Sequence, residues 1–171
     1  MKLREVFIEI LERYLQEYEK DNKISSPYYK DLKQRIEEVF EPLLEEFGLK
    51  INALGGMGVM RKVPYISFLA EGHHTNKGIY PIYHFDFEQQ LIFLDIGDAD
   101  DNPPPGELVE NFASRTVELL PHFQLREKDG YPQKAYQKDE LQENTLIEDL
   151  KAVFETYQFC LDEFDENIQR Y

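Results

Sequence analysis

A glycine-rich stretch at residues 53–65, ALGGMGVMRKVPY, has the residue types for binding a phosphate or for meeting a partner. Phosphate-binding glycine loops need glycines, and in one class a lysine, at fixed spacing so that backbone N–H groups surround the ligand. Met60 or Arg61 stands where those spacings require a glycine. The stretch therefore predicts a glycine-rich hairpin turn that presents the apolar Met57 at its tip, just ahead of two basic residues.

Two further clusters have residue types that bind metals or move protons. Adjacent histidines stand at His73 and His74, and oxygen ligands for a hard cation gather in one loop: Asp98, Asp100, Asp101 and Asn102. The acids lack the alternation and the following glycine of a calcium loop, and adjacent histidines on an extended chain point apart. A metal-dependent hydrolase is therefore the weaker alternative, and we expect no catalytic residue, metal or cofactor.

Helical periodicity at both ends of the chain predicts the elements that position the glycine-rich stretch. Apolar residues recur every three or four positions over residues 3–18 and 32–47, and a glycine follows the second segment. Pro42 is expected to kink or split that second helix. The same period returns over residues 146–168, and a shorter helix is expected near 107–120.

The middle of the chain has the two-residue period of β-strands. Four short runs are rich in β-branched and aromatic residues: LKINAL, VPYISFLA, GIYPIYHF and QLIFLDI. They predict a largely antiparallel meander. Alternation places Tyr80 and His84 on one face of their strand and Tyr83 and Phe85 on the other, in the core.

Together these elements predict an α+β fold, with a mainly antiparallel central sheet flanked by N- and C-terminal amphipathic helices. At 171 residues the chain fits one domain over 1–171, helical over 1–48, β-rich over 49–97, and loop and helical over 98–171. No apolar run is long enough to span a bilayer. A single cysteine, Cys160, excludes an internal disulfide framework and fits a cytoplasmic protein.

The charge of the chain is unevenly distributed. The formal net charge is -15, yet residues 50–84 carry a local balance of +3, so the remainder carries -18. The cations nearest the glycine-rich stretch are Arg61, Lys62 and Lys77. Their concentration favours phosphate contacts, and ordinary solvated charges are the alternative.

Four stretches, in this order and spacing, carry a resemblance to a known family: GGMGVMRKVPYISFLAEG, NKGIYPIYHF, LIFLDIGDADDNPPP and GYPQKAY. Together they resemble the N-terminal DNA-binding domain of McrB, in register over residues 49–136 and more loosely in the C-terminal helix. The resemblance implies a reader of methylated or hydroxymethylated cytosine in double-stranded DNA. Such a reader rotates the base out of the duplex into an aromatic pocket, while a side chain from the loop fills the gap.

The resemblance also implies roles for single residues. Met57 stands where the family usually has an aromatic wedge, and Tyr65 where the pocket tryptophan is common. Tyr80 and His84 are expected in the pocket, with His84 in place of an aliphatic residue, and Tyr136, or else Tyr131, from a later loop. In the alternative interpretation Tyr65 and Tyr80 are core aromatics, and His84 is a strand residue with a satisfied hydrogen bond.

The expected partners follow from the same resemblance. In such systems a GTPase motor translocates DNA and a separate nuclease subunit cleaves it, and we expect no membrane partner and a monomeric isolated domain. The chain has no Walker motif, so it is an isolated reader or a piece of a longer protein. The alternative is a protein-interaction module that keeps the fold without binding DNA, which the net charge of -15 favours.

Overall fold

The computed structural model describes residues 2–72, 79–98, 106–128 and 130–169. Within these residues six strands form one sheet in the order β1-β2-β3-β4-β6-β5, and every neighbouring pair is antiparallel. The strands are β1 (Lys50–Ala53), β2 (Tyr65–Leu69), β3 (Ile79–Asp86), β4 (Leu91–Asp98), β5 (Gln124–Leu125) and β6 (Pro132–Gln137). The helices are α1 (Leu3–Glu9), the π-helical turn η1 (Ile10–Tyr14), α2 (Leu15–Lys20), α3 (Pro27–Phe47), α4 (Gly106–Leu119), the 3-10 turn η2 (Lys138–Glu140) and α5 (Glu143–Gln169).

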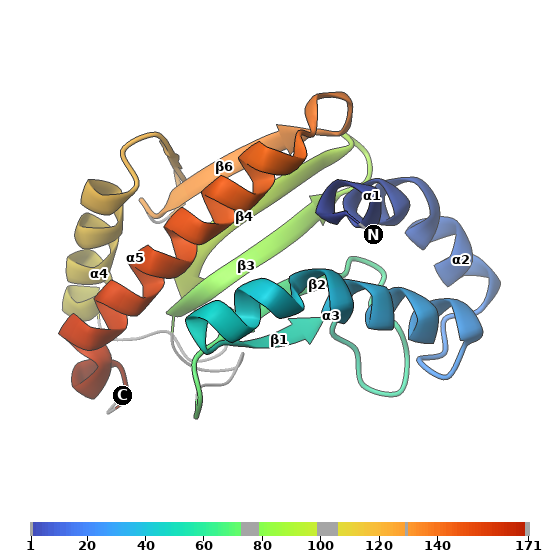
Figure 1. Ribbon diagram of the computed structural model, residues 1–171, viewed down its shortest axis with the longest axis horizontal. Coiled ribbons are helices and arrows are strands. Elements are labelled where there is room, and N and C mark those ends of the chain that lie inside the picture. The colour runs from blue at the N-terminus through green and yellow to red at the C-terminus, as the bar shows by residue number, and fades with distance from the viewer. Residues whose placement is uncertain (1, 73–78, 99–105, 129, 170–171) are drawn as a thin grey trace.

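Helices α1, α3 and α5 lie over one face of the sheet (Figure 1). Aromatic rings connect the helices to the sheet. The ring centre of Phe68 of β2 lies 5.1 Å from that of Phe40 of α3 and 4.9 Å from that of Phe154 of α5. Phe7 of α1 lies 4.8 Å from Tyr83 of β3. This arrangement confirms the predicted α+β fold, with helices from both ends of the chain packed on one antiparallel sheet.

Helix α3 runs without a break through Pro42. Ser26 caps its N-terminus, where the side chain accepts a hydrogen bond from the Tyr29 amide at 3.2 Å. Gly48 caps its C-terminus with a φ of 63°, the left-handed geometry that glycine adopts readily. Buried Phe40 and Leu43 pack on either side of Pro42, and Pro42 itself is exposed. The predicted split is therefore wrong, because packing holds both halves of the helix.

The N-terminal helical segment contains a π-helical turn that its periodicity did not predict. Ile10–Tyr14 form this turn between α1 and α2, and Tyr14 is buried there. The segment 98–171 also differs from its prediction, since it contributes β5 and β6 as well as helices. Among the described residues, no helix combines the length and the apolar character needed to cross a bilayer.

Candidate nucleic-acid interface

The sheet face turned away from α1, α3 and α5 carries most of the predicted pocket residues. Residues directly opposite each other in an antiparallel pair share a face. Tyr65 of β2 is opposite His84 of β3, and Ile82 of β3 lies between Ser67 of β2 and Asp95 of β4. We call this surface the far face and define it by these five residues. The predicted alternation of Tyr80 with His84 is confirmed, as is the placing of Tyr83 in the core.

Tyr65 and His84 form the centre of the far face. As opposed residues they have Cβ atoms roughly 5 Å apart. Both side chains are partly exposed, and the amide of Asn52 donates to the Tyr65 hydroxyl at 3.4 Å. Tyr80 shares their face but lies four residues along β3 from His84, a distance of about 13 Å at the rise of a strand. The structure therefore brings Tyr65 and His84 together and leaves Tyr80 apart.

A buried carboxylate holds the histidine. Asp95 is only 1% exposed, and its Oδ2 lies 3.3 Å from His84 Nε2 and 3.2 Å from Arg126 Nη1. A carboxylate this deeply buried costs stability unless it is paired and hydrogen-bonded. When His84 Nε2 donates to Asp95, the imidazole ring is held in one orientation. Sequence analysis missed Asp95 and Arg126.

The glycine loop, residues 54–64, is tied to the helices at its base. The Tyr29 hydroxyl donates to the Gly55 carbonyl at 2.7 Å, and the Tyr14 hydroxyl donates to the Arg61 carbonyl at 2.6 Å. Burial raises the pKa of both phenols above the ordinary tyrosine value, so both remain protonated donors at neutral pH. The base of the loop is therefore fixed on the N-terminal helices.

Met57 lies at the tip of this anchored loop and is 95% exposed. The prediction that the hairpin presents an apolar side chain is confirmed, and isolated bridges Met57–Val59 and Lys23–Val59 shape the tip. The Met60 amide also donates to the Asn22 carbonyl at 2.6 Å. Met57 is therefore an exposed side chain on a loop whose backbone is held by hydrogen bonds.

Gly55 allows the loop to approach Tyr65 closely. Its φ is +66°, and a Cβ added there would lie 2.7 Å from Tyr65 Cε1 and 2.8 Å from Arg61 Cδ. The Arg61 guanidinium lies 5.1 Å from the centre of the Tyr65 ring, within the range of a cation–π contact. Loop and far face are therefore joined through the tyrosine ring, with Arg61 over that ring.

Tyr136 does not join this group. It was predicted to come from a loop, but it lies in β6, pairs with Ile92 of β4 and points to the helix-covered face. Its hydroxyl donates to Asp149 of α5 at 2.6 Å, and the side chain is buried. Alternation along β6 is the physical reason, because it turns Ala135 to the far face and Tyr136 to the helices. Tyr131, the other candidate, is fully buried.

Several predicted residues are not described by the structure. Lys77, the adjacent histidines at 73 and 74, and the loop residues Asp100, Asp101 and Asn102 lie outside the described residues, as does the side chain of Asp98. Within the part of the chain that is described, no cluster of three or more His, Cys, Asp or Glu could hold a metal ion.

The geometry joins an exposed apolar tip, an aromatic ring, a fixed imidazole and two exposed cations, Arg61 and Lys62. Such a set can stack on a planar group and hydrogen-bond to its edge. In comparisons with known proteins, no family model and no curated protein matches the chain.

Proposed function

We propose that this chain is a McrB-like DNA-recognition module that reads modified cytosine in double-stranded DNA by base flipping. The observation that carries the proposal is Met57, an apolar side chain that is 95% exposed on a loop anchored by hydrogen bonds and packed against Tyr65. A side chain so exposed adds little to the stability of the folded chain. Its placement is that of a group that acts on a partner.

Base flipping needs a wedge that enters the duplex and an aromatic group that stacks on the extruded base. Removing a base from the stack costs a few kcal/mol, which a wedge in the duplex and stacking in a pocket must offset. Met57 would be the wedge, and Tyr65 would stack on the extruded base. A thioether lacks the π-stacking of an aromatic wedge, so more of the free energy falls to Tyr65 and its neighbour His84.

Arg61 has a role in this proposal that depends on its position over Tyr65. The planar guanidinium covers the ring face on which a base would stack. An entering base would displace Arg61 from the ring, and the displaced guanidinium would bind a phosphate. Lys62 is exposed and forms no ion pair among the described residues, and we assign it and Lys77 to phosphates as well.

The proposal assigns no catalytic step to this chain. Cleavage and translocation would belong to a nuclease subunit and a GTPase motor, which we propose as its functional partners. Incubation of the chain with modified duplex and Mg²⁺ or Mn²⁺ tests this point. Cleaved DNA, at a rate that rises with protein concentration, would make the chain an enzyme.

A protein-interaction module is the second candidate, and the net charge of -15 favours it. A strongly acidic chain repels nucleic acid at long range, so DNA binding would depend on local cations. In this candidate Met57 and Tyr65 would meet an apolar and basic surface of another protein. The two candidates differ in one observable, which is affinity for DNA at low salt.

The experiment measures binding to three duplexes that differ only in one base: cytosine, methylcytosine or hydroxymethylcytosine. A 2-aminopurine beside that base reports unstacking by its fluorescence, and a single strand of the same sequence serves as the unstacked reference. The variants are Met57→Gly and, as a control for added loop flexibility, Val59→Gly, which removes another exposed apolar side chain of the same loop.

For a reader, modified duplex binds best and raises the 2-aminopurine signal. Met57→Gly weakens duplex binding and leaves single-strand binding nearly intact, because a single strand has no gap to fill. Val59→Gly has little effect on either. Equal losses on duplex and single strand would remove the wedge role from Met57, and no binding to any DNA at low salt would favour the protein-interaction module.

A further inference from the structure

A groove beside the glycine loop separates the first turns of α3 from the end of β1. Its volume is about 570 Å³, and its lining includes Lys30 and Lys33 of α3, Asn52 of β1, and Gly55 and Gly56 of the loop. We infer that this groove binds the sugar-phosphate backbone of DNA on the side of the flipped base, an inference that rests on the proposed function.

The groove adjoins the surface on which the base would stack. Asn52 lines the groove and also donates to the Tyr65 hydroxyl. Gly55 lines it too, and packs against the Tyr65 ring. A strand whose base stacks on Tyr65 therefore carries its neighbouring phosphates along Asn52 and into the groove.

The lysines of the groove are available to an anion. Lys30 and Lys33 are exposed, and their spacing of three residues places them on one side of the helix. Neither forms an ion pair among the described residues, and the nearby Asp31 is paired with Arg35 at 2.9 Å. Glu37 is the carboxylate in the lining, so the two lysines leave the groove with a positive balance.

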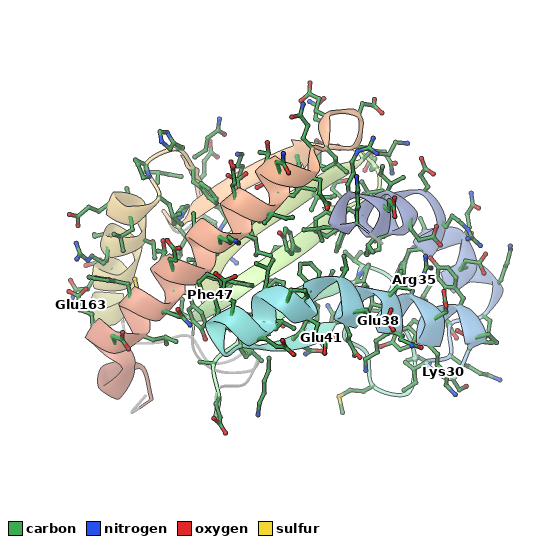
Figure 2. The ribbon with its side chains drawn as sticks, in the orientation of Figure 1. Lys30, Arg35, Glu38, Glu41, Phe47 and Glu163 are labelled. Carbon is green, nitrogen blue, oxygen red and sulfur yellow. The ribbon has the colours of Figure 1, made fainter. Side chains whose placement is uncertain are left out.

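Charge along α3 runs against the preference of the helix itself. Its first ten residues carry three cations, Lys30, Lys33 and Arg35, and one acid, Asp31, whereas the remainder carries five acids: Glu37, Glu38, Glu41, Glu45 and Glu46. The helix dipole favours acids in the first turn and cations in the last turn, and α3 has no acid in its first turn and no basic residue in its last. Figure 2 shows Lys30 near the start of α3, with Glu38 and Glu41 further along it. Helix stability does not explain the lysines, and phosphate binding does.

The test compares two double variants that remove the same charge. The groove variant combines Lys30→Ala with Lys33→Ala and removes both lysines of the groove. The control combines Lys138→Ala with Lys151→Ala and removes two lysines outside the groove, which are paired with Glu12 and Glu46. Binding to modified duplex is titrated at salt concentrations from 50 to 200 mM. Thermal melting of each variant establishes that it is folded.

Each phosphate contact contributes about 0.9 to the slope of log affinity against log salt, so the groove variant should lose about 1.8 of that slope. Between 50 and 200 mM salt the native chain should therefore lose roughly tenfold more affinity than the groove variant, and the control should keep the native slope. If the native chain binds and both double variants share its slope, or both lose it equally, the groove is not a phosphate site, although the proposed function stands. If the native chain binds no DNA, the proposed function and this inference are both wrong.

Discussion

The two faces of the sheet carry different kinds of side chain. The helix-covered face carries Phe68, Tyr83 and Phe85, all buried against aromatic and aliphatic side chains of the helices. The far face carries Tyr65 and His84, both partly exposed, over polar groups. The two sets of side chains alternate along the same strands, so each strand contributes to both faces.

The buried polar groups of the far face carry a cost in stability. Asp95 is a buried carboxylate that needs both His84 and Arg126 beside it. Ser67 is also fully buried, and its hydroxyl has no hydrogen-bond partner among the described residues. Apolar residues of similar size would give a more stable sheet. Burial against the helices determines the covered face, whereas stability alone does not explain Asp95 and Ser67 on the far face.

The largest effect expected from this comparison is on stability. Phe68 is fully buried, and its ring contacts Phe40, Tyr83 and Phe154. Phe68→Ala should lower the free energy of unfolding by about 3–5 kcal/mol, because it leaves a cavity between sheet and helices. Urea denaturation measures the change. A loss below about 1 kcal/mol would mean that the covered face does not determine the fold.

The matching change on the far face should affect binding and spare stability. Tyr65→Ala should weaken binding to modified duplex by about 1–3 kcal/mol, roughly 5- to 150-fold, which is the range for base–aromatic stacking. Tyr65→Phe keeps the ring and is the control, so it should retain most of the affinity. A sharp fall in melting temperature for Tyr65→Ala, with unchanged affinity of the folded fraction, would make Tyr65 a core residue and erase the contrast between the faces.

Sequence alone predicted the parts of this contrast that depend on local periodicity. The two-residue period of β2 and β3 placed Tyr83 in the core and put Tyr80 and His84 together on the other face, as the register shows. The glycines predicted a turn with Met57 at its tip, which is also observed. Each of these features is fixed within a few residues of the chain, where pattern is informative.

The parts that sequence did not predict depend on contacts between distant segments. Strand β6 contains lysine and glutamine in place of β-branched residues, so its pairing with β4 has little local signal, and Tyr136 was expected in a loop. Asp95 stood within an apolar run, which was a signal for a paired buried acid, but its partner Arg126 comes from 31 residues further along. The anchoring of the loop by Tyr14 depends on a π-helical turn that periodicity does not reveal.

A pH titration can locate the ionisable groups of the covered face. Burial, the nearby Tyr83 and the hydrogen bond to Asp149 raise the pKa of Tyr136, so the folded state keeps its proton when the unfolded state ionises near pH 10. The resulting stability is present below pH 10 and is lost as pH rises further, at about 1.4 kcal/mol per pH unit for one tyrosine.

Tyr136→Phe should therefore be less stable at pH 7, where the bond to Asp149 is lost, but should show a shallower fall in stability above pH 10. Urea denaturation at pH 9, 10 and 11 measures that slope. Met57→Gly removes no titratable group and should keep the native slope. An unchanged slope in Tyr136→Phe would mean that other buried tyrosines account for the alkaline sensitivity of this face.

The smallest expected effect is on the ratio of the affinities for hydroxymethylcytosine and methylcytosine. One buried methyl group is worth about 0.8 kcal/mol, a few-fold in affinity, so a pocket that reads only methyl discriminates weakly. His84 is held by Asp95, and a hydrogen bond between an imidazole and a hydroxyl has a net value of about 0.5–1.5 kcal/mol. We therefore expect hydroxymethylcytosine to bind about two- to tenfold more tightly than methylcytosine in otherwise identical duplexes.

His84→Leu should reverse that order, because leucine accepts the methyl group and leaves the hydroxyl without a partner. Asp95→Asn should narrow the preference, since the imidazole is then less firmly oriented. A clear preference of the native chain for methylcytosine, or an unchanged order in His84→Leu, would show that the imidazole does not select the base.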